Sequence, residues 1–453
     1  MSRLFALVQR WREDPLLGRV VRNSSYLFSS NSISMGLGYI IGLLVPIMLG
    51  PAMYGVLGMV TTYVSTVNRL LSFRMNEVVI KHGGQHLALG EKQQAAALVK
   101  AAGLAELVTS LVSYLLLLGT ASLAARFLIK DASVTGWIAF YGLTLVANMV
   151  SETSVAVLQL GNHYRSQAAL TLVQNIVTTL IVVGGYLFVG GFFVILLAYL
   201  AGKMVYGVGI AILALRSMKT TFGEDWRRAP LAAIPDWRGV GRFAISTNLS
   251  GTMNMVLRDS EVLWIGFFLN NTAAGYYKFA QALVGLVVMP VQPLINTTAP
   301  EINQAVVRKE WNALGRLLRR TSFMAFGWTA AAAAGAAVIG YPVLSAIKGG
   351  AYLPALPILL ILLVGFGAAN ALFWNRPLIL ALNRPNLPLR VTLITGALRL
   401  ALMFWLVPLW GAPAQAGLMS AYLISSIGWV AWRGIREVRQ LAHRNPVAGE
   451  GAA

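Results

Sequence analysis

Three ionised side chains interrupt an apolar stretch in the second half of the chain. The segment LRDSEVLWIGFF, residues 257–268, holds Arg258, Asp259 and Glu261 within four positions. If this segment and the residues just before it form one helix, Asn254, Arg258 and Glu261 follow one another at intervals of four and three residues. This spacing places them on one face of the helix. An arginine on such a face can bind an anion, and the neighbouring carboxylates can bind a cation or a proton.

The composition of the chain places these charges inside a membrane. Of its 453 residues, 57% are hydrophobic and 11% are charged, and the mean hydropathy is +0.67. A soluble domain carries about 25% charged residues, so an ordinary soluble protein is excluded. Apolar runs recur along the chain, and each is long enough to cross a hydrocarbon core of ~30 Å as a helix. A charge facing lipid there would cost at least ~2.5–3.5 kcal/mol, so Arg258, Asp259 and Glu261 must face protein or water.

The expected fold class is an all-α polytopic membrane protein of about 12 transmembrane helices, in two six-helix lobes around a central cavity. A β-barrel would instead show short alternating segments. The longest charged interruption separates the sixth span from the seventh. The predicted parts are a cytoplasmic amphipathic N-terminus at 1–22, an N-lobe at 23–215, a cytoplasmic linker at 216–242, a C-lobe at 243–432 and a cytoplasmic tail at 433–453.

The distribution of basic residues predicts the topology. Of the 36 Lys and Arg residues, 26 lie at the two termini or around the even-numbered gaps between spans, and three lie in the odd-numbered gaps. Basic residues concentrate on the cytoplasmic side of membrane proteins, so both termini are expected in the cytoplasm. The same topology explains most of the net charge of +20, and no nucleic-acid partner is expected.

Two similar motifs lie 220 residues apart. LGPAMYG at 49–55 aligns with LNNTAAG at 269–275, so that Gly55 matches Gly275. Each motif ends the first span of its half, which predicts a duplicated six-helix unit with a transport cavity between the copies. With the loop GEKQQAA before the third span, the motifs resemble the polysaccharide-transporter branch, which includes Wzx-type oligosaccharide flippases, of the multidrug/oligosaccharidyl-lipid/polysaccharide exporter superfamily. Asn270 departs from the family pattern, which has a glycine at that position.

The resemblance implies a flippase that moves undecaprenyl-diphosphate-linked oligosaccharide repeat units across the bacterial inner membrane by alternating access, for O-antigen or exopolysaccharide synthesis. It also implies contact of the cargo with membrane lipid, and it suggests the polysaccharide polymerase and chain-length machinery as partners. No enzymatic activity is expected. The chain has no GxxxxGK[ST] phosphate loop, and no expected span contains a histidine that could serve as a catalytic base.

Basic residues within the expected spans are the candidates for binding a diphosphate, because guanidinium groups bind its oxygens in pairs. For Arg74 an equally supported alternative is that its side chain extends to the membrane interface. For Arg258 the alternative is an ion pair, with Glu261 or with a carboxylate from another helix, that only fixes helix packing. The residues assigned to the substrate are Arg258, Asn254, Lys278, Arg69, Arg74 and Arg399.

Carboxylates within the spans are the candidates for ion coupling. A carboxylate held away from water binds a proton more readily, so these residues are expected to couple transport to H⁺ or Na⁺. The alternative for each is a pair with a buried arginine. No resident cofactor or metal site is expected, and the chain has no cysteine. The residues assigned to coupling are Asp259, Glu261, Glu152 and Glu106.

The alternative function is an ion-coupled multidrug or metabolite antiporter of the same superfamily. If the chain exported cations in this way, its cavity would be dominated by acidic residues. The expected spans hold seven basic and five acidic residues, which favours an anionic cargo.

Overall fold

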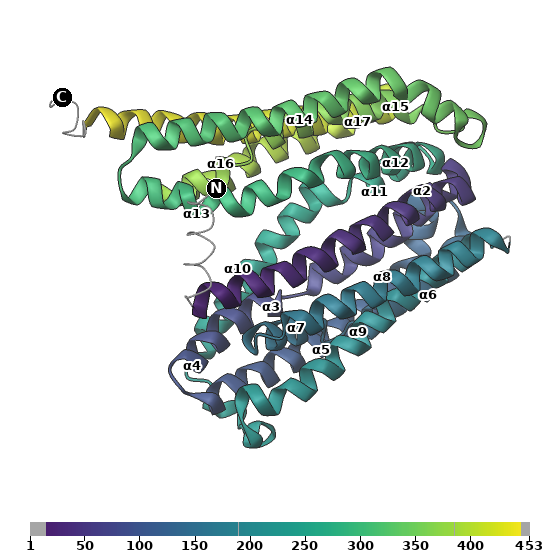
Figure 1. Ribbon diagram of the computed structural model, residues 1–453. Coiled ribbons are helices and arrows are strands. Elements are labelled where there is room, and N and C mark those ends of the chain that lie inside the picture. The colour runs from purple at the N-terminus through teal and green to yellow at the C-terminus, as the bar shows by residue number, and fades with distance from the viewer. Residues whose placement is uncertain (1–14, 189, 385, 445–453) are drawn as a thin grey trace. The chain divides into compact units, whose positions relative to one another are not determined.

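The structure is a computed structural model that describes residues 15–188, 190–384 and 386–444. Residues 1–14 of the expected amphipathic N-terminus and residues 445–453 of the expected tail lie outside this part of the chain. The described residues form helices and no strand (Figure 1). The all-α fold class is therefore confirmed.

Nine helices in the described residues are long and apolar enough to cross a membrane. Two of them contain a break: α2 (Pro15–Leu71) at Gly50, with φ 72°, and α17 (Asn386–Arg444) at Gly411, with φ 73°. Glycine adopts such positive φ values at no steric cost, so each of these helices consists of two spans joined by a sharp turn. The segment Trp237–Phe268, whose α10 and α11 are separated by a break, adds one more span. The expected number of about 12 transmembrane helices is confirmed.

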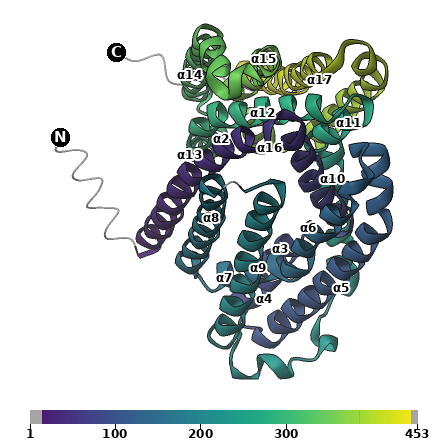
Figure 2. The same ribbon diagram turned by 90° about the vertical axis from the view of Figure 1, so that its right-hand side faces the viewer.

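The chain packs into two compact units. Unit 1 contains Met1–Leu49 and Met59–Ser260. Its buried core joins Ala96 of α5 to Val157 of α7 and Ile210 of α9, and α8 lies along α9 (Figure 2). Besides its parts of α2, its main elements are α3 (Met75–Val78), η1 (Val79–Gly83), α4 (Gly84–Ala88), α5 (Lys92–Ala124), α6 (Thr135–Ala147), α7 (Ser151–Leu160), α8 (Tyr164–Leu187), α9 (Phe192–Phe222), α10 (Trp237–Asn254) and η6 (Met255–Asp259).

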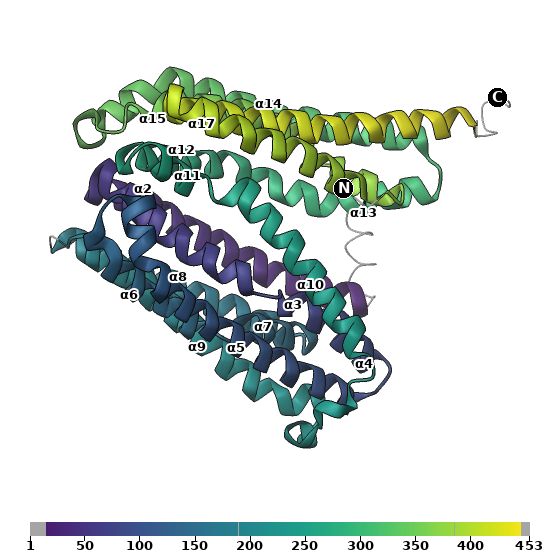
Figure 3. The same cartoon turned by 180° about the vertical axis from the view of Figure 1, so that it is seen from behind.

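Unit 2 contains Gly50–Gly58 and Glu261–Ala453. One of its buried clusters joins Leu314 and Leu318 of α14 to Leu378 of α16, and α14, α15 and α17 run side by side (Figure 3). Besides Gly50–Gly58 and α17, its main elements are α11 (Glu261–Phe268), α12 (Asn271–Val288), α13 (Gln292–Val307), α14 (Trp311–Ala346), α15 (Ala355–Ala371) and α16 (Asn375–Ala381).

The boundaries of these units differ from those expected for the lobes. Unit 1 includes α10, which the sequence placed at the start of the C-lobe. The predicted linker is also partly helical, because α9 continues through Arg216 to Phe222. Two short 3₁₀ turns, Glu224–Arg228 and Leu231–Ala233, then lead to α10.

The glycines of the two similar motifs pack directly against each other. A Cβ atom added at Gly55 would lie 1.8 Å from the carbonyl oxygen of Asn271, and one added at Gly275 would lie 1.9 Å from that of Pro51. The 220-residue offset that matches Gly55 to Gly275 also matches Pro51 to Asn271, so the contact is reciprocal. Small residues allow this close approach of helices, and the approach explains why Gly50–Gly58 belongs to unit 2.

Candidate functional site

Three spans of unit 1 lose regular α-helical structure within the membrane-crossing part of the chain. The breaks lie at residues 72–74 between α2 and α3, at 148–150 between α6 and α7, and at 255–260 after α10. None of these segments contains a proline. Broken helices place backbone polar groups where a substrate or ion can bind, and they are typical of transporter sites.

Polar side chains connect the breaks of the second and fourth spans to each other and to α10. The side-chain amide of Asn248 on α10 donates a hydrogen bond to the carbonyl oxygen of Ser72. The hydroxyl of Ser72 in turn donates to Oε1 of Glu152 at 3.1 Å, and Nδ2 of Asn76 donates to the carbonyl oxygen of Glu152 at 3.4 Å. The second and fourth spans are thereby held together at their irregular segments, and the regular helix α10 of the seventh span is bonded to the break at residues 72–74.

Glu106 on α5 caps the second half of the broken fourth span. Its carboxylate accepts the backbone N–H of Glu152 at 2.8 Å and that of Thr153 at 2.9 Å. These N–H groups belong to the first turn of α7, which has no carbonyl partner within its own helix, and the helix dipole favours a negative charge at this end. The buried position of Glu106 therefore has a structural explanation, whereas its role in ion coupling stays a prediction.

Glu152 borders a cavity of about 340 Å³. Its Oε1 atom accepts the hydrogen bond from Ser72, while Oε2 is buried and has no hydrogen-bond partner among the described residues. Arg74 lies in the same cavity and pairs with Glu77 at 2.8 Å. The backbone of Arg74 is left-handed, with φ 49° and ψ 53°, a conformation that is uncommon for a residue other than glycine.

A second cavity in unit 1, of about 220 Å³, has walls rich in hydroxyl groups. Arg69 and Asp259 form an ion pair at its edge, and about half of each side chain is exposed. The hydroxyl groups can exchange hydrogen bonds with a sugar or a phosphate. They were missed by the sequence interpretation, although their i, i+1, i+4, i+5 spacing marks one face of a helix. These residues are Thr61, Thr62, Ser65 and Thr66.

Arg258 is exposed and lies in the π-helical turn η6, whose Met255 and Asp259 line this cavity. The ion pairs of the described chain do not include it. The prediction that Arg258 and Glu261 share one helical face is wrong. The π turn and the break at Ser260 change the helical register, so Arg258 is exposed while Glu261 is 2% exposed. Asn254 ends α10, and its side chain lies outside the described residues.

Glu261 belongs to a buried polar network in unit 2. It pairs with Arg399 of α17, which is 5% exposed. Gln281 donates a hydrogen bond to Oε2 of Glu261 at 2.7 Å, and Gln415 donates to Oε1 at 3.4 Å. The alternative in which Arg258 pairs with Glu261 is therefore wrong, because Arg399 occupies that role. An arginine enclosed in this way is available to a substrate only if the network opens.

Lys278 lies on α12 of unit 2 and is partly buried. Its aliphatic stem packs on Gly58, where an added Cβ would lie 2.4 Å from Cδ of Lys278. The structure thus gathers Arg69, Arg74 and Arg258 around the breaks of unit 1, whereas Lys278 and Arg399 belong to unit 2.

Comparisons with known proteins agree with a membrane protein. Residues 20–306 match the family described as polysaccharide biosynthesis protein. The chain is similar to inner membrane protein YghQ of Escherichia coli K12, with 23% identity over 352 residues that cover 77% of this chain and 98% of that protein.

Two solved structures share the fold over most of their length. The lipid II flippase MurJ in an inward closed conformation has a TM-score of 0.68 at 12% identity, covering 94% of this chain and 91% of that one. A multidrug resistance MATE family transporter of the MOP superfamily, in an inward-facing conformation, has a TM-score of 0.65 at 12% identity, covering 92% and 99%.

Proposed function

Because the chain belongs to the polysaccharide biosynthesis protein family, we propose that it is a flippase for undecaprenyl-diphosphate-linked oligosaccharide repeat units. It would carry them across the bacterial inner membrane, with both termini in the cytoplasm, for O-antigen or exopolysaccharide synthesis. The polysaccharide polymerase and the chain-length machinery would receive its product. The likeness of the fold to lipid II flippase MurJ supports a lipid cargo.

The observation that carries this proposal is the cluster of broken spans in unit 1, which is lined by arginines and hydroxyl groups. Arg258 is exposed without an ion pair among the described residues, and Arg69 is half exposed beside the hydroxyl-rich cavity. Guanidinium groups suit the oxygens of a diphosphate. Hydroxyl groups such as those of Thr62 and Ser65 suit a glycan, which both donates and accepts hydrogen bonds.

In the proposed mechanism, Arg258 binds the diphosphate first. Asp259 holds Arg69 in an ion pair in the described state, and the arriving diphosphate would compete with this carboxylate for the guanidinium. The exchange costs little because both partners are half exposed, and exposed pairs contribute only about 0–1 kcal/mol. Alternating access of the two units would then expose the cargo on the other side of the membrane.

We propose Glu152 as the residue that couples transport to H⁺ or Na⁺. Its buried Oε2 atom has no hydrogen-bond partner in the described part of the chain, although its other oxygen is bonded to Ser72. An unsatisfied buried oxygen is costly, and binding of a proton or a sodium ion would remove that cost. The hydrogen bond to Ser72 would transmit the change to the break at residues 72–74.

The second candidate is an ion-coupled multidrug or metabolite antiporter. The likeness of the fold to a multidrug resistance transporter and the acidic residues Glu77 and Glu152 around one cavity favour it. Arg69 in the wall of the hydroxyl-lined cavity and the exposed Arg258 of η6 favour an anionic cargo instead. The flippase is therefore the function that the site supports better.

Vesicles that contain the purified protein and a fluorescent undecaprenyl-diphosphate-linked oligosaccharide test the proposal. A flippase makes the cargo of the inner leaflet accessible to an external glycan-degrading enzyme. In vesicles that contain the cargo but not the protein, this cargo stays protected. Counterflow of a cationic dye in the same vesicles tests the antiporter. Dye transport without cargo exposure would refute the flippase.

A further inference from the structure

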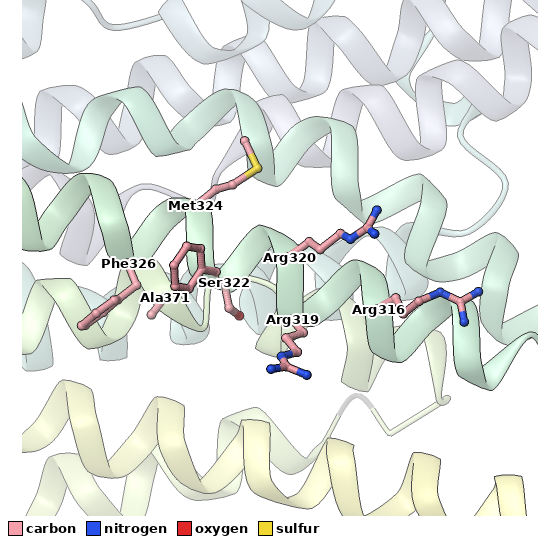
Figure 4. Close-up of a pocket in the computed structure, with 8 residues that line it drawn as sticks. Arg316, Arg319, Arg320, Ser322, Met324, Phe326 and Ala371 are labelled. Carbon is pink, nitrogen blue, oxygen red and sulfur yellow. The ribbon is translucent and has the colours of Figure 1, made fainter.

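Residues of the first half of α14 in unit 2 line a third cavity, of about 860 Å³. Arg316, Arg319 and Arg320 line one end of it, and Met324 and Phe326 line the part that follows along the helix (Figure 4). Phe323 belongs to the same lining. The sequence interpretation treated these arginines only as part of the cytoplasmic charge. Their arrangement beside a cavity indicates a binding site.

The three arginines are free to bind an anion. Arg319 and Arg320 lie three and four residues after Arg316, so each of them is a neighbour of Arg316 on the helix surface, and all three are exposed. Among the described residues none of them forms an ion pair, and no carboxylate lines the cavity. Three guanidinium groups in this arrangement suit a ligand with several anionic oxygens.

The apolar end of the cavity lies at membrane depth. Residues 321–346 of α14 contain no charged side chain, so this part of the helix matches the hydrocarbon core. Phe323, Met324 and Phe326 are 75%, 61% and 55% exposed, as expected for side chains that contact lipid. The arginines therefore lie at the level of the headgroups, directly next to a surface for a hydrocarbon chain.

A chain of hydrocarbon attached to a diphosphate matches both ends of this cavity. An ordinary anionic phospholipid presents a single phosphodiester to the three arginines and leaves most of their donors unused, whereas a diphosphate offers more anionic oxygens. Under the proposed topology, this end of α14 also lies in the cytoplasmic leaflet, from which the flippase would take its cargo.

We propose that this cavity is a docking site for the prenyl-diphosphate end of the lipid-linked cargo. The diphosphate binds Arg316, Arg319 and Arg320, and the prenyl chain lies along Phe323, Met324 and Phe326. The identity of the ligand rests on the proposed function. The site itself belongs to unit 2 and uses none of the residues assigned above to the broken spans of unit 1.

Binding of polyprenyl diphosphate to the full chain in phosphatidylcholine nanodiscs tests the inference. We expect Arg316→Gln/Arg319→Gln/Arg320→Gln to weaken binding by about tenfold or more, because charged hydrogen bonds are lost. The matched control Arg308→Gln/Lys309→Gln/Arg390→Gln removes the same number of exposed charges. Its affinity for polyprenyl diphosphate should stay within about twofold of the wild-type value. Phe323→Ala/Phe326→Ala should weaken the binding of polyprenyl diphosphate but not the binding of inorganic diphosphate.

Three results would overturn the inference. The first is equal binding by the triple variant and the wild type, and the second is an equal loss in the control. The third is that the triple variant loses phosphatidylglycerol binding as strongly as it loses polyprenyl diphosphate binding, which would identify a general anionic-lipid site. Cargo exposure in vesicles separates this inference from the proposed function. Wild-type binding at the cavity without cargo exposure would refute only the flippase, and normal binding by the triple variant of an active flippase would refute only the docking site.

Discussion

At the scale of single residues, the charges of the segment 257–268 separate into two roles. Arg258 and Asp259 remain exposed in unit 1, whereas Glu261 is enclosed in unit 2 with Arg399. A buried ion pair contributes little net stability, but loss of one partner leaves an uncompensated charge. The Glu261–Arg399 pair is therefore best tested by comparing single and double substitutions.

We expect Arg399→Met to lower the free energy of unfolding by about 3–5 kcal/mol, because Glu261 is then buried without its cation. The double variant Glu261→Gln/Arg399→Met should lose less than Arg399→Met alone. Thermal unfolding of the purified protein in detergent, followed by tryptophan fluorescence, measures both. If the double variant lost as much free energy of unfolding as Arg399→Met and Glu261→Gln lose together, the two residues would act independently.

The second prediction at this scale concerns Glu152, whose Oε2 atom lacks a partner in the described chain. Glu152→Gln should abolish the response of cargo exposure to an imposed H⁺ or Na⁺ gradient, because an amide binds neither ion as a carboxylate does. Binding of the cargo should persist. Glu224→Gln, in an exposed turn, is the control. An unchanged gradient response in Glu152→Gln would exclude Glu152 as the coupling residue.

At the scale of helices, the reciprocal contact of Gly55 and Gly275 is the most demanding feature. Each position would bring an added Cβ within 2 Å of a backbone oxygen of the other motif. A backbone atom cannot move aside as a flexible side chain can, so the helices themselves would have to separate. The contact thus fixes the distance between the start of the second span and α12 within unit 2.

We expect Gly55→Ala and Gly275→Ala each to destabilise the protein by about 1–3 kcal/mol, the usual effect of overpacking. Gly119→Ala is the matched control, since a Cβ there meets nothing within 4 Å, and alanine favours a helix by up to ~1 kcal/mol. Thermal unfolding in detergent compares the three variants. Equal melting temperatures for Gly55→Ala and Gly119→Ala would contradict the close contact.

The positions of the spans could be predicted from the sequence, but the breaks at residues 72–74, 148–150 and 255–260 could not. Span positions follow from local apolar composition. The breaks contain no proline, and they depend on partners from other spans: Asn248 bonds the carbonyl of Ser72, and Glu106 caps α7. A periodicity within one helix cannot show such contacts.

The same reason explains why the expected helical face of Arg258 and Glu261 is wrong. The sequence interpretation extended a regular helix through residues 254–261, and the π turn invalidated that register. It gave a pair with Arg258 or with another buried arginine as alternatives for Glu261, but it could not identify the arginine, because Arg399 is 138 residues away. The hydroxyl-rich face of α2 can be read from the spacing of its serine and threonine residues, although these residues carry no charge.

At the scale of the whole molecule, the fold is that of a polytopic membrane protein with two compact units, and the family is one of polysaccharide biosynthesis. We propose that the two units work by alternating access, in which the cargo site opens first to one side of the membrane and then to the other. The central claim is that the exposed arginine in the broken seventh span binds the diphosphate of that cargo during translocation.

The exposure of undecaprenyl-diphosphate-linked oligosaccharide by Arg258→Ala in vesicles tests this claim most directly. We predict a loss of about tenfold or more, the effect of removing a charged hydrogen bond of ~1.5 kcal/mol, with an unchanged melting temperature because Arg258 is exposed. Arg390→Ala, another exposed arginine, should retain the wild-type rate. A wild-type rate in Arg258→Ala, at equal protein per vesicle, would contradict the claim.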